Sequence, residues 1–267
     1  MPKRECISFV MLGTGNLAFH LTDALVHSGY KLKQVVGRSA RPTKKFAGIF
    51  NSNFCNHLKH LDYSADVYFV CVSDDQIPVL TKQINLQNKL IVHCSGAVEM
   101  SVLKNCSSNY GVLYPLYTFS KDDHEIDFRK VPFFIEGNSS RSLSAIKKIA
   151  LNLSEKVKVM KSLQRRKLHL SAVLSANFTN YLIGLAALYL KRERSGNIND
   201  LLPLLEKTIL KLHHQQPVDA QTGPARRNDA ETMREHLHLL QHYPEHKKVY
   251  RFFSAAIIKR YHSEKHK

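Results

Sequence analysis

The chain has 267 residues, of which 43% are hydrophobic, and is long enough to form two globular domains. Its formal net charge of +17 is compatible with nucleic acid or anionic ligands, but the basic residues are scattered and accompany no known nucleic-acid-binding motif. The longest apolar run, residues 181–190, is too short for a bilayer, which needs about 20 apolar residues. We therefore expect a protein that binds neither nucleic acid nor a membrane.

The cysteines and the N-terminus favour a cytoplasmic protein. The 5 cysteines are unevenly placed and form no Cys-x-x-Cys pair, which is typical of reduced thiols. The first apolar run is too short for a signal peptide and ends in a glycine turn.

The first part of the chain alternates apolar, strand-like segments with helical ones. An apolar strand is predicted over residues 6–12 and an amphipathic helix over 16–29. Further strands are predicted over residues 30–37, 65–72, 89–96, 131–137 and 156–160. Near-continuous apolar strands between helices predict a doubly wound parallel sheet, in an α/β domain over residues 1–160.

The rest of the chain, residues 161–267, shows only helical patterns and predicts a smaller all-α domain. The patterns break at RSGNIND, HHQQPVDAQTGP and HYPEH, where glycine, proline and polar residues gather.

A glycine turn between the first strand and the first helix predicts a dinucleotide site. Gly13 allows a tight turn, Gly15 lets the backbone approach a pyrophosphate, and Ala18 allows close packing of helix on strand. The helix N-terminus offers free N–H groups to the phosphates, so Thr14, Asn16 and Leu17 join the predicted cofactor-binding residues. A glycine turn with a purely structural role is the alternative.

The end of the second strand favours NADP over NAD. NAD-binding domains usually carry an acidic residue there for the ribose hydroxyls, whereas this chain has VVGRSARPTKK. Arg38 and Ser39 are predicted to bind a 2′-phosphate, with Arg41, Lys44 and Lys45 nearby. A solvated basic loop is the alternative.

Ligands of such a sheet lie beyond the carboxyl ends of its strands. This places Val72 and Ser73 beside the dinucleotide, and Ser95 and Tyr114 beside a substrate. Each of these polar residues also suits a helix cap, and capping is the preferred role of Asp74 and the residue after it.

The long helix in LQRRKLHLSAVLSANFTNYLIGLAALYLKR carries polar residues among apolar ones. At 100° per residue, His169, Asn177 and Asn180 fall on one side of the helix. His169 is a candidate proton donor, because histidine exchanges protons near neutral pH, and Asn177 is a candidate partner of the substrate. A packing contact or a dimer contact explains the same stripe.

The segment TGPARRNDAETMREHL places two arginines directly before a helix. Asn228 and Glu231 have the spacing of a capping box, which predicts that the helix begins there. A helix N-terminus favours anions, so Thr222, Arg227 and Asp229 are candidate contacts to an anionic substrate. Pairing of the arginines with an internal acid such as Asp229 is the alternative.

The histidines near the C-terminus do not predict a metal site. His238, His242 and His246 are four residues apart, but Pro244 interrupts the helix, and no acid or cysteine completes a ligand set.

Six segments together resemble a bacterial family with a Rossmann-like domain followed by a helical domain of unknown function 2520. They are GTGNLAFHL, VSDDQI, HCSGA, YPLYTFS, LHLSAVLSANF and TGPARRNDAETMREHL. The family is similar in plan to pyrroline-5-carboxylate reductases and to 6-phosphogluconate dehydrogenase-like proteins. The resemblance implies NADP as cofactor, a homodimer formed through the helical domain, and a substrate cleft between the domains.

The sequence as a whole predicts an NADP-dependent oxidoreductase that moves hydride to or from a small, anionic carbonyl, hydroxy or imino substrate. A nucleotide-binding or sensor protein without catalytic activity is the main alternative, and a nucleic-acid-binding protein is a weaker one.

Overall fold

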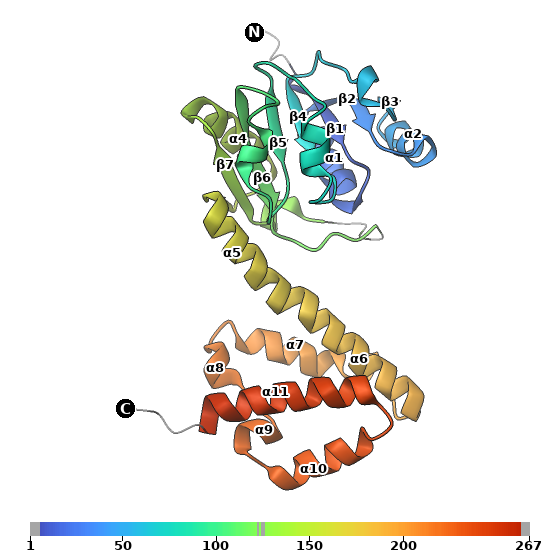
Figure 1. The fold of residues 1–267 in the computed structure, drawn as a ribbon, viewed down its shortest axis with the longest axis vertical. Coiled ribbons are helices and arrows are strands. Elements are labelled where there is room, and N and C mark those ends of the chain that lie inside the picture. The colour runs from blue at the N-terminus through green and yellow to red at the C-terminus, as the bar shows by residue number, and fades with distance from the viewer. Residues whose placement is uncertain (1–5, 122, 124–125, 263–267) are drawn as a thin grey trace. The chain divides into compact units, whose positions relative to one another are not determined.

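The structure is a computed structural model that describes residues 6–121, 123 and 126–262 (Figure 1). The chain forms two compact units, Met1–Leu174 and Ser175–Lys267. The change from strands to helices comes earlier than this division, after the strand Val157–Val159. The domain boundary near residue 160 therefore stays a prediction.

The first unit is built on one sheet of eight strands in the order β3-β2-β1-β4-β5-β6-β7-β8. The strands are β1 (Ser8–Leu12), β2 (Lys31–Val36), β3 (Asn53–Cys55), β4 (Val67–Val70), β5 (Leu90–His93), β6 (Asn109–Pro115), β7 (Phe133–Gly137) and β8 (Val157–Val159). All neighbours are parallel except β6 and β7, which are antiparallel. The carboxyl ends of β1 to β6 therefore lie along one edge of the sheet.

Helices cover both faces of this sheet, because alternate strand residues are apolar on both faces. Helices α1 (Asn16–His27), α2 (Ala40–Ile49) and α4 (Ser140–Leu153) bury one large apolar cluster that includes Phe9 and Phe69. Helix α3 (Ile77–Thr81) and the short helix η2 (Met100–Leu103) cover a second cluster on the opposite face. The predicted doubly wound α/β fold is confirmed.

Two strands were not predicted. β3 has three residues, of which Asn53 and Phe54 are exposed, so it lacks an apolar pattern. β6 contains Gly111 and ends at Pro115, residue types that usually weaken a strand. Gly111 is needed there because a Cβ atom would lie 2.2 Å from the carbonyl oxygen of Glu136 on β7.

A long helical segment starts after β8. It comprises α5 (Ser162–Ala172), a π-helical stretch (Val173–Asn177) and α6 (Phe178–Glu193). This helix, Ser162–Glu193, is long and apolar enough to cross a membrane by length and composition, with a mean hydropathy of 1.4 in its most apolar window. A single helix of this kind is weak evidence for a membrane span.

The described residues of the second unit form helices joined by turns and contain no strand. After α6 it contains α7 (Leu202–Lys211), α8 (Pro217–Ala220), α9 (Pro224–Arg227), α10 (Ala230–Leu239) and α11 (Pro244–His262). Only Leu185, Ala225 and His246 are buried among the residues that the structure describes in this unit. Many large apolar side chains are exposed, including Leu204 at 64% and Phe252 at 68%.

Candidate functional site

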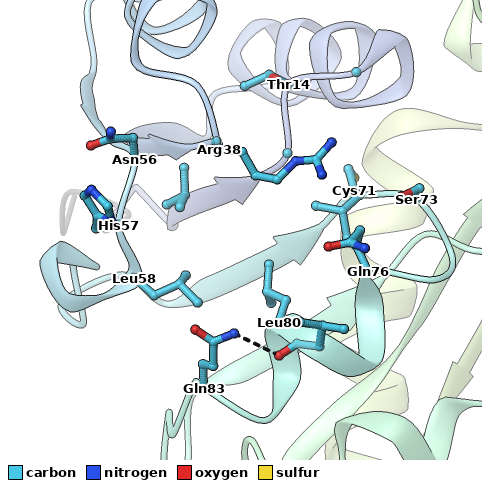
Figure 2. A pocket seen from close by; sticks show the side chains of 16 residues that line it. Thr14, Arg38, Asn56, His57, Leu58, Cys71, Ser73, Gln76, Leu80 and Gln83 are labelled. Carbon is cyan, nitrogen blue, oxygen red and sulfur yellow. Dashed lines mark hydrogen bonds between the residues drawn. The ribbon is translucent and has the colours of Figure 1, made fainter.

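A pocket of about 550 Å³ opens at the carboxyl edge of the sheet (Figure 2). Its walls come from the turns after β1, β2, β3 and β4 and from α3. The lining residues are Gly13, Thr14, Gly15, Val36, Gly37, Arg38, Asn56, His57, Leu58, Cys71, Val72, Ser73, Gln76, Val79, Leu80 and Gln83. The size suits one part of a dinucleotide, since small-molecule sites usually measure about 300–1,000 Å³.

The two glycines of the turn have different physical roles. Gly13 has φ +126°, and a Cβ atom there would lie 2.1 Å from the carbonyl oxygen of Cys71, so the fold itself requires glycine. A Cβ atom on Gly15 would meet no atom of the residues that the structure describes within 4 Å. Gly15 lines the pocket, so that space is open for a ligand that approaches the backbone closely.

Helix α1 starts at this turn with unused hydrogen-bond donors. Gly15 is its N-cap, no side chain of the described residues caps it, and its first turn carries no acidic residue. The first N–H groups of a helix lack acceptors within the helix and attract anions. The turn therefore fits a phosphate group.

Arg38 supplies positive charge to the same pocket. Figure 2 shows its side chain reaching across the pocket towards Ser73. The guanidinium takes part in none of the ion pairs among the described residues. It is thus available to an anionic ligand.

The pocket contains six of the predicted cofactor residues: Gly13, Thr14, Gly15, Arg38, Val72 and Ser73. The others have roles in the fold. Asn16 donates from Nδ2 to the carbonyl oxygen of Phe119 at 3.0 Å, Leu17 packs on the core, and Ala18 is fully buried. Ser39 is the N-cap of α2, and its carbonyl oxygen accepts a hydrogen bond from Thr43 at 2.6 Å.

One wall of the pocket was missed by the sequence analysis. Asn56, His57 and Leu58 follow β3, and the short length of that strand hid their position at the sheet edge. The α3 residues, among them Leu80, also line the pocket. The sequence could have indicated these residues, because a helical pattern that follows Ser73 places its first turns at the same edge of the sheet.

A second polar cluster lies at the same edge of the sheet, at the end of β6 and in the loop after β5. The Tyr114 hydroxyl and His169 Nδ1 are 3.0 Å apart, and the two rings meet edge to face with centroids 5.9 Å apart. Gly96 packs on both rings: a Cβ atom there would lie 2.6 Å from His169 Nδ1 and 2.7 Å from Tyr114 Cζ. The structure thus brings together two predicted site residues that are distant in sequence.

Burial controls the protonation of this cluster. It raises the pKa of Tyr114 to about 12, with the charge of Asp74 acting in the same direction. Burial also lowers the pKa of His93, at the end of β5, to about 3, and the nearby Arg165 charge adds to this shift. The phenol is therefore protonated and His93 neutral at physiological pH.

Hydrogen bonds fix the loop that carries the predicted residue Ser95. The Ser95 N–H donates to His93 Nδ1 at 3.2 Å, so His93 holds its proton on the other ring nitrogen. Ser95 Oγ accepts from the N–H groups of Ala97 and Val98, both at 3.0 Å. These contacts shape the turn over Tyr114, and they occupy the serine hydroxyl as an acceptor.

A buried ion pair anchors α5 to this loop. Arg165 donates to Glu136 Oε2 and to the carbonyl oxygen of Val98, both at 2.6 Å, and its side chain is 1% exposed. Ser162 adds hydrogen bonds to Glu136 and from the Met100 N–H. Because residues four apart share one face of a helix, the anchor at Arg165 turns His169 towards the sheet.

The predicted polar stripe of His169, Asn177 and Asn180 stays a prediction. Its angles assumed uniform α-helical spacing from His169 to Asn180, but Val173–Asn177 is π-helical. Asn177 is exposed in the second unit, and its substrate role stays a prediction.

The predicted anion site in the second unit has internal partners. Arg227 lies 3.8 Å from Asp229 in an ion pair, and the Arg226 guanidinium lies 4.2 Å from the ring centre of Tyr261. Thr222 is exposed. The internal pairing that the sequence left open is thus present, and contacts of Thr222, Arg227 and Asp229 to a substrate stay predictions.

The start of α10 corrects one prediction. Asp229, not Asn228, is the N-cap, because its side chain accepts from the Thr232 N–H at 3.1 Å. Asn228 instead ends α9 in the left-handed conformation, with φ 57°. Asparagine tolerates this conformation, so the preceding short helix displaces the cap by one residue.

The C-terminal histidines have other partners. His246 Nε2 bonds to the carbonyl oxygen of Leu185 at 3.0 Å, and His236 Nδ1 bonds to the Tyr250 hydroxyl at 2.9 Å. His246 therefore joins α11 to α6, and His236 joins α10 to α11.

Two families match the sequence. The family described as NADP oxidoreductase, coenzyme F420-dependent, matches residues 8–96, and the domain of unknown function 2520 matches residues 131–257. No curated protein matches the chain.

Solved structures agree with this two-domain plan. A protein of Bacteroides fragilis named as an NADP oxidoreductase is 35% identical, with a TM-score of 0.90 over 96% of this chain and 99% of that chain. The 1-pyrroline-5-carboxylate reductase of Streptococcus pyogenes is 12% identical, with a TM-score of 0.63 over 96% and 98%. The reductive aminase of Aspergillus terreus, in complex with NADPH and ethyl-5-oxohexanoate, is 12% identical, with a TM-score of 0.71 over 94% and 92%.

The two more distant likenesses show the fold alone. NADP is the cofactor named for the matching family and for the Bacteroides protein, so the NADP prediction is confirmed at the level of the family.

Proposed function

Because this chain belongs to the same family as the Bacteroides fragilis NADP oxidoreductase, we propose that it transfers hydride between NADP(H) and a small carbonyl, hydroxy or imino substrate. The cofactor supplies the hydride when it is bound. The residues of this chain bind the cofactor, orient the substrate and handle the proton.

The open space at Gly15 is the observation that carries the cofactor site. It lies beside the uncapped start of α1, and both fit a pyrophosphate. Arg38, exposed and without an acidic partner among the described residues, suits the 2′-phosphate that distinguishes NADP from NAD. Val72 and Ser73 continue the wall towards the second polar cluster.

The substrate side of the proposal rests on the Tyr114–His169 pair. It supplies a protonated phenol and an imidazole at the edge of the sheet where Ser73 also lies. His169 is the proposed proton donor or orienting group, and Ser95 and Tyr114 contact the substrate. We also propose that Asn177 donates a hydrogen bond to the substrate. An anionic group of the substrate would contact Thr222, Arg227 and Asp229.

We further propose that the protein is a homodimer through its helical unit. With three buried residues among those described, this unit leaves apolar side chains such as Phe252 in water, which a second copy would cover. Light scattering should give twice the chain mass. Phe252→Asp should shift the protein towards monomer, whereas Phe54→Asp, an exposed apolar residue of the sheet unit, should not; a monomeric wild-type protein contradicts the proposal.

Cofactor titration tests the binding site directly. NADPH should bind about tenfold or more tightly than NADH, because a charge-assisted contact to Arg38 is worth a factor of this order. Arg38→Ala should remove most of the difference, and Lys59→Ala, an exposed lysine outside the pocket lining, should retain it. Equal affinities for the two cofactors would contradict the role of Arg38.

Turnover with a panel of keto and imino acids tests the reaction. Oxidation of NADPH that depends on one of these acids supports the oxidoreductase. Tight NADPH binding without turnover of any member of the panel would instead favour the sensor protein.

A further inference from the structure

The Tyr114–His169 pair suggests how a proton reaches the substrate. We propose that Tyr114 donates the proton in the proposed reaction and that His169 returns a proton to Tyr114; this rests on the proposed function. His169 is then a positioning and relay residue that acts through the phenol.

The position of Tyr114 favours it over His169 as the group next to the substrate. Tyr114 lies in β6, within the sheet whose carboxyl edge forms the pocket. The charge of Asp74 acts on its phenol, and Asp74 directly follows the pocket residue Ser73. His169, by contrast, comes from α5 and contacts the phenol through Nδ1. The phenol is thus linked to the pocket wall through the charge of Asp74, and the imidazole of His169 is linked to the phenol.

The electrostatics of the phenol supports a relay. Burial and the Asp74 charge keep the hydroxyl protonated, so it has a proton to give. The same burial makes the phenolate costly, because an isolated buried charge is unfavourable. A proton returned from His169 Nδ1 avoids the phenolate, and the half-buried His169 side chain is partly exposed to solvent.

In the direction of reduction, bound NADPH would give up a hydride by breaking a C–H bond of its nicotinamide ring and would be oxidised to NADP+. A C–H bond would form at the carbonyl or imino carbon of the substrate, and the π-electron pair would move to the oxygen or nitrogen. That atom takes the proton of Tyr114 as the phenolic O–H bond breaks. Protonated His169 gives its Nδ1 proton to the phenol oxygen and is left neutral, and water then reprotonates it.

The surrounding residues hold the pair in this geometry. Gly96 leaves room for the two rings, since a Cβ atom would lie within 2.7 Å of Tyr114 and 2.6 Å of His169. Arg165, one helical turn before His169, fixes α5 through Glu136 and Val98. Gly96→Ala should therefore separate the pair and resemble a loss of Tyr114, whereas Gly48→Ala, which meets no atom within 4 Å, should not.

The experiment uses Tyr114→Phe in the full chain, with Tyr110→Phe as matched control. Tyr110 lies on the same strand, and its hydroxyl makes no hydrogen bond among the described residues. The first readout is the ¹⁵N NMR spectrum of the imidazole side chains, which reports the hydrogen bond and tautomer of His169 without turnover. The His169 signals should move in Tyr114→Phe and stay in place in Tyr110→Phe.

The second readout is kinetic, with a keto or imino acid that the wild-type protein reduces. Tyr114→Phe should lower kcat by about 10²–10⁴-fold, the usual contribution of a general acid, with KM and NADPH affinity nearly unchanged. His169→Ala should lower kcat as well, and added imidazole should restore part of it.

The outcomes separate this proposal from the proposed function. The role of Tyr114 is overturned if the His169 signals do not move in Tyr114→Phe. It is also overturned if Tyr114→Phe keeps full kcat while His169→Ala loses kcat. Both outcomes leave the proposed oxidoreductase function standing. Tight NADPH binding with no turnover of any tested acid overturns the oxidoreductase and the relay together. Moved His169 signals with a selective loss of kcat support the relay.

Discussion

Two regions at one edge of the sheet are built in different ways. The pocket at the glycine turn is made mainly by backbone: a residue without a side chain at Gly13, an open space at Gly15 and an uncapped helix end. The Tyr114–His169 pair is made by side chains from distant segments, held by the buried Arg165–Glu136 ion pair. The comparison teaches that a site built by local backbone can be recognised from a short motif, whereas a site built by long-range contacts cannot.

The largest loss of stability is expected at Gly13, where the backbone leaves no room for a Cβ atom. Gly13→Ala should destabilise the protein by about 4 kcal/mol or more, because its Cβ atom would collide with the Cys71 carbonyl at a positive φ. Gly15→Ala should cost about 1 kcal/mol or less and still weaken NADPH binding. Urea unfolding and cofactor titration of the two variants measure both effects. Equal losses of stability would show that the two glycines have the same role.

Around the Tyr114–His169 pair, the next largest loss of stability is expected from the buried Arg165–Glu136 ion pair. Arg165→Ala should cost about 3–5 kcal/mol, because it leaves Glu136 partly buried without its cation. The neighbouring Arg166→Ala removes an ion pair with Glu99 whose side chains are half exposed, and should cost about 1 kcal/mol or less. Urea unfolding compares them; a similar, small loss in both variants would mean that the buried pair does not anchor α5.

A smaller effect should appear as a pH dependence of stability. The pKa of His93 is lowered from 6.5 to about 3, mainly by burial, so the unfolded chain binds a proton that the folded chain excludes between these values. Stability should therefore be complete above pH 6.5 and fall as the pH drops towards 3, by up to about 1.4 kcal/mol per pH unit.

Urea unfolding at pH 7 and pH 5 tests this dependence. His93→Asn keeps an acceptor for the Ser95 N–H and should lose less stability between the two pH values than the wild-type protein. His27→Asn, in which an exposed histidine is replaced, is the control. An identical loss in wild type and His93→Asn would contradict the burial argument.

Much of the fold followed from the sequence because apolar strands and the glycine turn are local patterns. The doubly wound sheet, the turn at Gly13 and the basic residue Arg38 were recognised this way. β3 and β6 were missed because a three-residue strand and a strand with Gly111 and Pro115 are defined by their neighbours in the sheet. The π-helical stretch before Phe178 was also missed, because the sequence analysis assumed one helical period along the whole segment.

The candidate site was predicted only in part, because its contacts join residues that are distant in the sequence. Tyr114 and His169 were each proposed separately, but their contact joins residues 55 positions apart. Arg165 and Gly96 were not singled out, since nothing in their local sequence distinguishes a buried arginine from the exposed Arg166.

The side chain of Asn16 joins two parts of the first unit that are 103 residues apart. It stands in the first turn of α1, yet it bonds to the carbonyl oxygen of Phe119 in the loop after β6, where His20 also bonds to Ser120. Removing Asn16 would therefore release that loop, and any drop in cofactor affinity would combine two causes. Thr14, whose hydroxyl makes no hydrogen bond within the described chain, gives the cleaner test: replacing it by valine keeps its shape and changes only what it offers to a bound phosphate.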